Sequence, residues 1–161
     1  MLVAKIGGGR LISVLSHDTD TCMASADSTP SDVHGIFPGG NGMTGTIMFT
    51  DGSSALLNFL TEASVGIGKE YLEVHCEGQG DRLDNFVGLE DGDGSNLGRW
   101  NIPNKEYREE LDVFLDVIAD PRSEGSLAIS RHEIMSNRLM FAMSRRARRG
   151  GVIQNIGEFQ S

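Results

Sequence analysis

The segment around Asp51-Gly52 constrains the fold of this chain more than any other part of the sequence. Residues 45–50 and 54–61 are β-prone and flank Asp-Gly, a strong signal for a two-residue turn, which predicts an antiparallel hairpin. The second strand has two apolar sets on opposite faces: Ala55, Leu57 and Phe59 on one, Leu56 and Leu60 on the other. A sheet that is apolar on both faces must be covered on both. We therefore expect helices of this chain on one face and a second subunit on the other.

A helix, a loop and further strands are predicted on either side of this hairpin from residue spacing and turn chemistry. In chain order these are a helix over 11–24, a loop over 25–41 with an edge strand near 33–37, strands over 70–76 and 81–89 joined by a turn at 78–80, and a loop over 91–98. The strands follow one another without a crossover pattern, which favours antiparallel pairing.

Two helices are predicted in the last third of the chain. Asn104 is a candidate N-cap with Glu106 in the first turn, and Pro121 lies beyond the end of this helix. Ser130-Arg131-His132-Glu133 has the pattern of a capping box for the last helix, which Gly150-Gly151 would end. Their apolar faces would consist of Tyr107, Leu111, Phe114, Leu115 and Ile118 in the first helix and of Met135, Leu139 and Ala142 in the second.

The order of helix, strands and helices predicts an α+β fold with a largely antiparallel open sheet, helices on one face and an oligomer interface on the other. The sequence shows no internal repeat and no linker. We therefore expect a single domain over residues 1–161, a length sufficient for a hydrophobic core.

Charge and composition argue against several kinds of partner. The net charge of −9 and the pI near 4.8 disfavour a nucleic-acid partner, which would need a basic surface. No apolar run is long enough to span a bilayer, and Met1 to Ile6 is too short for a signal peptide, so we expect no membrane partner and a cytoplasmic location. Cys22 and Cys76 form no CxxC motif, which favours two reduced and buried thiols.

Several motifs have a simpler explanation than a binding site. Gly7-Gly8-Gly9 follows a possible strand, but a dinucleotide fingerprint needs a third glycine where Ile12 stands. A calcium loop starting at Asp91 would need glycine at Asn96 and glutamate at Ile102, so we predict a solvated turn. For the cations over 145–149 we prefer a favourable position at a helix C-terminus to a phosphate or nucleic-acid site.

A metal site at His17, Asp18 and Asp20 is a further possibility, because imidazole and carboxylates are common ligands. Residues 17 and 18 point apart on a helix, however, and the sequence contains no second histidine cluster. We therefore expect no metal at these residues.

Four motifs in this order and spacing resemble the C-terminal domain of the Gfo/Idh/MocA oxidoreductases, the glucose–fructose oxidoreductase and inositol dehydrogenase family. They are Gly7-Gly8-Gly9-Arg10 leading into Ser16-His17-Asp18-Thr19-Asp20, then Thr46 to Ser53, Tyr71 to Gly78, and Arg108 to Ile118. The resemblance covers residues 7–150. It implies a domain that supplies one wall of a substrate pocket and the sheet face used in oligomerisation.

The resemblance also implies which residues would act. His17 would line the active site as a catalytic residue, with Arg10, Ser13 and Asp20 at the substrate. Asp20 would orient His17 or cap locally rather than act as a base. Ser13 stands where inositol-dehydrogenase-like members carry an aspartate, so the polyol proton relay of that branch is not expected here. The alternative for His17 is a partly buried structural histidine.

The complete enzyme implied by the resemblance would be an NAD- or NADP-dependent dehydrogenase for a sugar, a polyol or a related small-molecule substrate. A Rossmann-type nucleotide-binding domain would precede this chain and supply a lysine in a Glu-Lys-Pro motif. None of Lys5, Lys69 and Lys105 lies in such a motif. We therefore expect this chain alone to bind no cofactor and to lack redox activity. The other hypotheses are a non-enzymatic scaffold and a small-ligand-binding domain.

Overall fold

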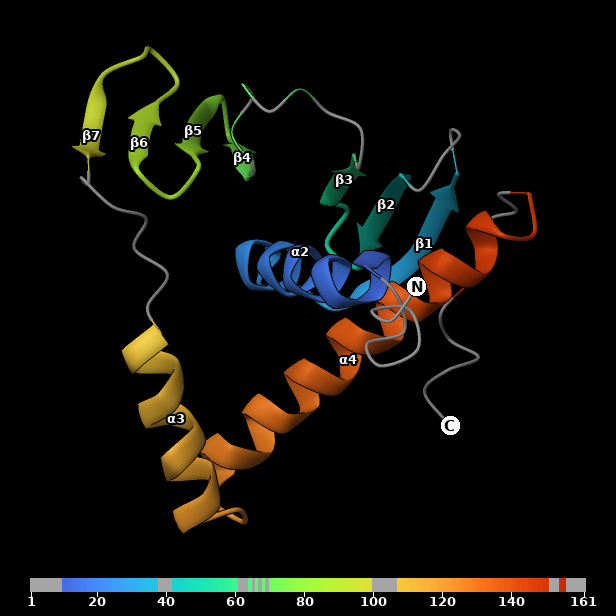
Figure 1. Cartoon of the computed structure of the whole chain (residues 1–161), viewed down its shortest axis with the longest axis vertical. Helices are drawn as coiled ribbons and strands as arrows, with labels where there is room; N and C mark the ends of the chain where they lie inside the picture. Colours follow the sequence, from blue (N-terminus) through green and yellow to red (C-terminus); the bar gives the residue numbers. More distant parts are fainter. Residues whose placement is uncertain are drawn as a thin grey trace. The chain divides into compact units, whose positions relative to one another are not determined.

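The chain forms two compact units in the computed structural model, which describes residues 10–37, 42–60, 64, 66, 68, 70–99, 107–150 and 154–155 (Figure 1). The first unit comprises Met1–Glu62 and Glu124–Ser161, and the second comprises Ala63–Ser123. The predicted α+β class with open antiparallel sheets and helices is confirmed, and the strands are divided between two four-stranded sheets. That residues 1–161 make a single domain stays a prediction.

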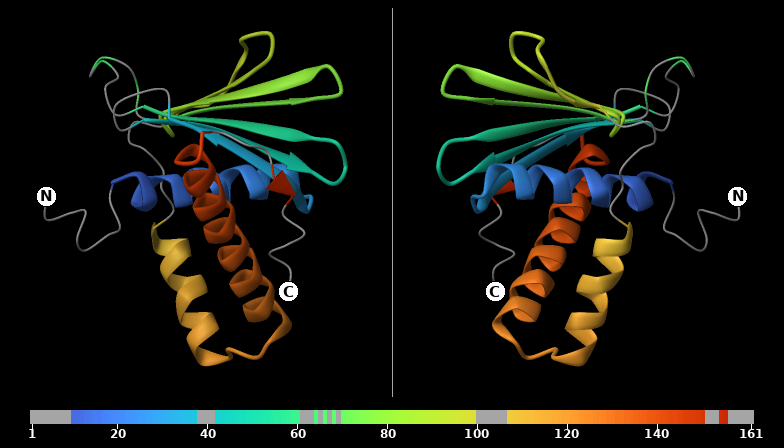
Figure 2. Two further views of the ribbon diagram at one scale, coloured as in Figure 1. Left: turned by 90° about the vertical axis from the view of Figure 1, so that its right-hand side faces the viewer. Right: turned by 90° about the vertical axis from the view of Figure 1, so that its left-hand side faces the viewer.

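The first unit packs two helices on one face of its sheet, as Figure 2 shows. The sheet order is β3-β2-β1-β8, and all neighbours are antiparallel. Helix α4 contacts β1 and β2, and α2 contacts α4 and β3. The elements are α2 (Arg10–Ala26), β1 (Pro30–Ile36), β2 (Met43–Phe49), β3 (Ser54–Phe59), α4 (Glu124–Ala147) and β8 (Gln154–Asn155).

The core lies between this sheet and the two helices, and the predicted division of the hairpin strand is confirmed. Leu57 is 5% exposed and faces the core with Phe59, whereas Leu56 is 68% exposed on the opposite face with Leu60. The most deeply buried apolar side chains are Leu15, Val33, Met43, Ile47, Leu139, Met140 and Met143.

The hairpin loop differs from the predicted two-residue turn by one residue. The Phe49 N–H donates to the Ser53 carbonyl at 3.0 Å, and the Gly52 N–H donates to the Phe49 carbonyl at 3.1 Å, which encloses a three-residue loop. Gly52 has φ of 91°, a conformation that glycine adopts without strain. Ser53 also donates its N–H and hydroxyl to the Asp51 carboxylate, which lowers the pKa of Asp51.

The predicted loop over 25–41 contains the seven-residue strand β1, which overlaps the edge strand predicted near 33–37. β1 lies between β2 and β8, so the prediction of an edge strand was wrong. Its polar residues misled the prediction because Asp32 and His34 alternate with the core-facing Val33 and Gly35. Pro30 occupies the first position of the strand, where a missing N–H is tolerated.

The last helix begins earlier than predicted. α4 starts at Glu124, so Ser130 to Glu133 lies inside it and is not a capping box; the Ser130 hydroxyl donates to the Ser126 carbonyl at 2.9 Å instead. The predicted glycine stop is confirmed, because α4 ends at Ala147 and Gly150 has φ of 83°. The predicted stripe is confirmed too, since Leu139 and Ala142 are buried and Met135 packs against the core.

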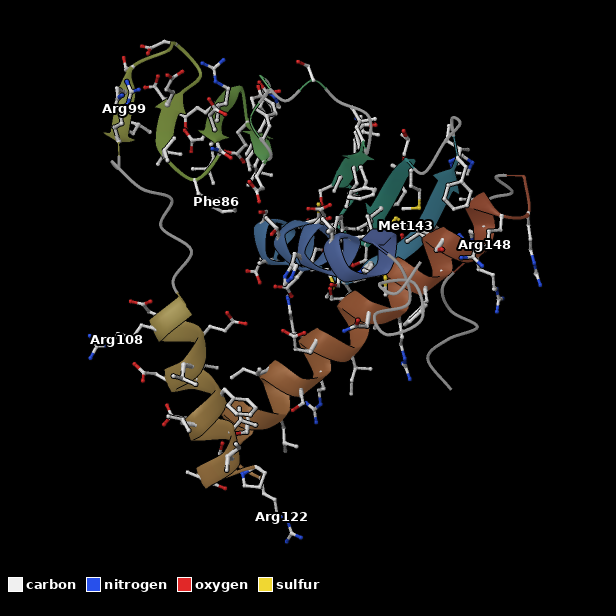
Figure 3. All side chains as sticks on the ribbon, viewed as in Figure 1. Phe86, Arg99, Arg108, Arg122, Met143 and Arg148 are labelled. Atoms are coloured by element: carbon white, nitrogen blue, oxygen red, sulfur yellow. The ribbon has the colours of Figure 1, made fainter. Side chains whose placement is uncertain are left out.

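The basic run at the end of α4 is not uniformly exposed. Arg146 is 3% exposed, and its Nη1 donates to the Val33 carbonyl of β1. Figure 3 shows Met143 beside the sheet and Arg148 pointing away from it. A buried charge-assisted hydrogen bond therefore ties the end of α4 to the middle of the sheet.

In the described residues, the second unit contains an antiparallel sheet with the strand order β4-β5-β6-β7 and the helix α3. The elements are β4 (Tyr71–Cys76), β5 (Gln79–Asp84), β6 (Gly88–Asp91), β7 (Asn96–Arg99) and α3 (Tyr107–Ala119). The strand predicted over 70–76 is confirmed. The turn that follows is Glu77-Gly78, both with positive φ, so residues 79 and 80 already belong to β5.

The predicted loop over 91–98 contains the start of β7, and its first half is the expected turn. The Asp91 carboxylate accepts hydrogen bonds from the N–H groups of Asp93 and Ser95 at 3.1 and 3.0 Å. The predicted N-cap residues Asn104 and Glu106 lie outside the described residues. None of the described helices combines the length and the low polarity needed to cross a membrane.

Gly35 lets α4 lie directly on β1, which yields a stability prediction. A Cβ at Gly35 would lie 2.6 Å from the Met143 carbonyl oxygen, which is part of the backbone of α4. A Cβ at Gly45 would lie 2.7 Å from the Met143 Sδ, which is the movable end of a side chain. We expect Gly35→Ala to lower the free energy of unfolding by about 2–3 kcal/mol and Gly45→Ala by about 1 kcal/mol. Urea denaturation followed by circular dichroism measures both, and equal losses would contradict this account.

Candidate functional site

The candidate site is built on α2, whose inner face packs against α4 and β3. Leu15, Thr19 and Met23 recur every four residues on that face and are buried. Thr19 is the polar member of this row. Its hydroxyl lies 3.0 Å from the Ser136 hydroxyl of α4 and within reach of the Leu15 and Ser16 carbonyls, at 3.0 and 2.9 Å.

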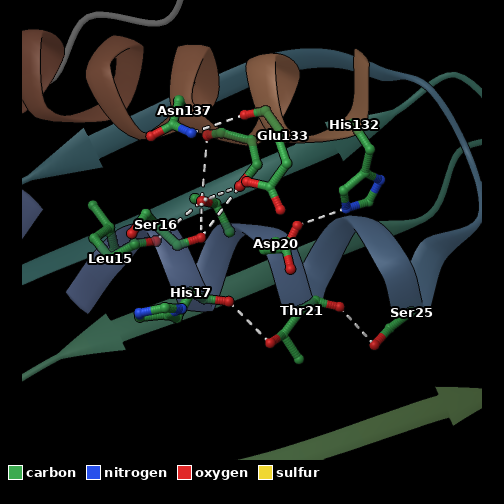
Figure 4. Close-up of polar contacts among 11 residues, drawn as sticks. Leu15, Ser16, His17, Asp20, Thr21, Ser25, His132, Glu133 and Asn137 are labelled. Carbon is green, nitrogen blue, oxygen red and sulfur yellow. Dashed lines mark hydrogen bonds and ion pairs between the residues drawn. The ribbon is translucent and has the colours of Figure 1, made fainter. Parts of the chain in front are cut away.

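The hydroxyl pair joins α2 to α4 through a closed set of hydrogen bonds (Figure 4). The Ser136 hydroxyl donates to the Ser16 carbonyl at 3.2 Å, and Thr19 has carbonyl acceptors on its own helix. Because these groups are buried, each needs its partner to offset the loss of water. The network therefore fixes the rotation of α2 and with it the direction of every side chain on its outer face.

Asp20 lies at the edge of the same contact. Its Oδ1 is 2.7 Å from the Nε2 of His132 on α4, and both side chains are partly exposed. The two groups are not aligned as a regular hydrogen bond, so the contact is one of charge when His132 is protonated. The carboxylate of Asp20 is directed at His132 rather than at His17 (Figure 4). The proposed orientation of His17 by Asp20 therefore has no geometric support, and the substrate-binding role of Asp20 stays a prediction.

His17 is exposed on the outer side of α2, so it is not the partly buried histidine of the alternative interpretation. Its backbone carbonyl accepts a hydrogen bond from the Thr21 hydroxyl at 2.9 Å. Helical spacing places positions 10, 13 and 17 on one face of α2. The side chains of Arg10 and Ser13 lie outside the described residues, so their substrate-binding roles stay predictions.

The two cysteines differ in their surroundings. Burial, and secondarily the charge of Asp18, raises the pKa of Cys22 to about 11, so this thiol is protonated at neutral pH. Cys76 is exposed on β4, contrary to the prediction of two buried thiols. In the part of the chain that the structure describes, no three His, Cys, Asp or Glu side chains are grouped so that they could hold a metal.

The residues that the sequence analysis missed are those that α4 contributes. Ser136 and His132 lie more than a hundred positions from the α2 residues that they contact. The interpretation of Ser130 to Glu133 as a cap also concealed that His132 is an interior residue of a helix. The helical spacing of α4 was the signal that could have placed Ser136 beside Leu139 and Met140 on the buried face.

The buried hydroxyl pair gives a prediction with a matched control. Thr19→Val removes the hydroxyl that bonds across to α4 and should lower the free energy of unfolding by about 1–2 kcal/mol. Thr21→Val removes a hydroxyl that bonds only within α2 and should change it by less than about 0.5 kcal/mol. Urea titrations of both variants measure the difference. A loss in Thr21→Val as large as that in Thr19→Val would show that the cross-helix bond is unimportant.

Comparisons with known proteins rest on structure, because no family model and no curated protein matches the sequence. The fold is similar to that of UDP-N-acetylglucosamine 3-dehydrogenase GnnA from Acidithiobacillus ferrooxidans. The TM-score is 0.57 at 15% identity, over 81% of this chain and 45% of that chain. The WlbA dehydrogenase from Bordetella pertussis, in complex with NADH and UDP-GlcNAcA, matches with a TM-score of 0.48 at 16% identity, over 87% of this chain and 42% of that chain.

This chain therefore spans less than half the length of either dehydrogenase. The fold assignment rests on the match to GnnA, since the second score is too low to support it. The predicted resemblance is confirmed at the level of the fold: the chain shares its fold with a part of the dehydrogenase GnnA that makes up 45% of that chain.

Proposed function

We propose that this chain is the substrate-binding and oligomerisation domain of an NAD- or NADP-dependent oxidoreductase that acts on a sugar or a sugar nucleotide. The observation that carries the proposal is the exposed His17 on α2 of a domain with this fold. The sugar class follows from the substrate named for the similar dehydrogenase, UDP-N-acetylglucosamine. A polyol or a related hydroxy compound is the wider class.

His17 would contact the hydroxyl of the substrate that is oxidised. A histidine imidazole in contact with solvent can accept the hydroxyl proton and release it to water. Arg10, Ser13 and Asp20 would hold other hydroxyl or phosphate groups of the substrate along the same helix. Ser16 and Thr19 would keep α2 in the rotation that presents His17 outward.

The cofactor would be held elsewhere in the complete enzyme. The segment from Gly7 to Ile12 does not fit a dinucleotide, because it lacks the third glycine of the fingerprint. None of the three lysines stands in a Glu-Lys-Pro motif. A Rossmann-type domain would supply both, and this chain would bind its substrate as one wall of a shared pocket.

Ligand binding tests this proposal. UDP-N-acetylglucosamine should shift amide resonances of α2 in the ¹⁵N-labelled chain, with millimolar affinity because one wall of the pocket acts alone. Loss of one hydrogen bond in His17→Ala should weaken that binding about fivefold or more, while His75→Ala, an exposed histidine of the second unit, should leave it unchanged. NADH and NADPH should not raise the unfolding temperature. A clear shift with either nucleotide would place the cofactor on this chain and overturn the proposal.

The open face of the first sheet tests the oligomerisation part. Leu56 is exposed on that face and Leu57 is buried beneath it. Leu56→Glu should leave the chain folded and reduce its oligomeric mass, because a charge opposes apolar contact. Leu57→Glu should unfold it, and Ala128→Glu at an exposed position of α4 should do neither. Light scattering and circular dichroism measure mass and folding, and an unchanged oligomer with Leu56→Glu would contradict this role for the face.

A second candidate is a scaffold domain without chemistry, favoured by the exposed Leu56 and Leu60 alone. It predicts the same effect of Leu56→Glu with no binding of the sugar nucleotide. The two experiments together therefore separate an enzyme domain from a scaffold.

A further inference from the structure

His132 of α4 contacts the carboxylate of Asp20 at a point that water does not reach. The Oδ1 of Asp20 is buried, although the side chain as a whole is partly exposed, and it lies 2.7 Å from the Nε2 of His132. In the part of the chain that the structure describes, this oxygen accepts no regular hydrogen bond, so the charge of a protonated His132 offsets its loss of water. The direction of the Asp20 side chain therefore depends on His132.

Asp20 also lies one helical turn from His17, the residue proposed to contact the substrate. Residues three apart on a helix are neighbours on its surface, and a carboxylate and an imidazolium at that spacing attract each other. Of the four positions one turn from His17, which are residues 13, 14, 20 and 21, only residue 20 carries a charge. Without His132, the Asp20 carboxylate would therefore turn towards the ring of His17.

The other acid beside His17 is placed differently. Successive side chains of a helix point about 100° apart, so Asp18 does not share the direction of His17. After burial, the charge of Asp18 is the second cause of the raised pKa of Cys22, which lies one turn further along α2. β3, which also packs against α2, carries no titratable side chain. Asp20 is therefore the carboxylate of this helix that can pair with His17.

We propose that His132 is a positioning residue for His17, because it holds the Asp20 carboxylate against α4. A carboxylate on the ring of His17 would occupy one ring nitrogen and stabilise the imidazolium form, which has no acceptor for a hydroxyl proton. With Asp20 held by His132, the ring of His17 keeps a nitrogen that can accept. That this nitrogen serves a substrate rests on the proposed function, whereas the competition of two histidines for one carboxylate does not.

The protonation of His17 tests the proposal, because ring ¹⁵N resonances distinguish imidazole from imidazolium. At neutral pH, His132→Ala should raise the ratio of imidazolium to imidazole in His17 about threefold, the effect of one exposed opposite charge. Asp20→Ala should not raise this ratio, either alone or combined with His132→Ala. Asn137→Ala is the matched control on α4, because the Asn137 side chain donates to the Glu133 carbonyl of its own helix at 2.9 Å.

A rescue variant separates positioning from a merely structural role. His132→Lys keeps a cation beside Asp20 and should leave the ratio in His17 at the wild-type value. An unchanged ratio in His132→Ala overturns the proposal, and so does a rise that persists when Asp20 is also replaced. Circular dichroism checks folding, and His132→Gln, which removes the charge with a smaller loss of volume, replaces His132→Ala if that chain does not fold.

Ligand binding separates this inference from the proposed function. UDP-N-acetylglucosamine should bind to His132→Ala about threefold more weakly than to His132→Lys, because the Asp20 carboxylate competes with the substrate for the ring of His17. If the ratio changes only when Asp20 is present but no variant binds the sugar nucleotide, the positioning role stands and the proposed function fails. Binding without any change of the ratio in His132→Ala gives the reverse result.

Discussion

The close approach of the α4 backbone to β1 at Gly35 is the constraint on which the first unit depends. Because Gly35 has no side chain, the Met143 carbonyl oxygen can lie 2.6 Å from where a Cβ would be, and α4 packs directly on the sheet. That depth brings Leu139 and Met140 into the core and lets Arg146 reach the Val33 carbonyl. If α4 lay slightly farther from β1, the gap between them would be too small for side chains or water to fill.

The position of the candidate site follows from this contact. α4 seated on the sheet presents Ser136 to Thr19, and the hydroxyl pair fixes the rotation of α2. Because Thr19 faces inward, His17 faces outward, half a helical turn away. The role proposed for His17 therefore depends on packing at the opposite side of α2, between two helices that are distant in the sequence.

Elements whose signals lie within a few residues can be predicted from the sequence. Elements whose bounds depend on pairing with distant residues cannot. The hairpin, α2, α3 and the glycine stop of α4 all follow from spacing and turn residues within a few positions. β1 was predicted only as an edge strand near 33–37, because the sequence does not show that a strand alternating Asp32 and His34 with Val33 and Gly35 is paired on both sides. The start of α4 was misplaced because Ser130 bonds back to Ser126 inside a helix as readily as it would cap one.

The candidate site likewise contains one residue that the sequence identifies and others that only the structure brings together. His17 could be singled out by its place after a glycine-rich turn, whereas His132 and Ser136 could not, since no spacing rule joins residues of two separate helices. Arg146 illustrates the converse. Four arginines within five positions predict a segment exposed to solvent. The structure buries Arg146, because the Val33 carbonyl of the sheet accepts its hydrogen bond.

The hairpin loop has a consequence for the outer surface of the sheet. The bonds between Phe49 and Ser53 that close the loop fix the register of β2 and β3, in which Met48 pairs with Ser54. A slip of this pairing by one residue would turn every β3 side chain over, so that Leu56 would enter the core and Leu57 would face outward. Which residues form the outer surface, and thus what the chain can associate with, therefore depends on the strand register that the loop fixes.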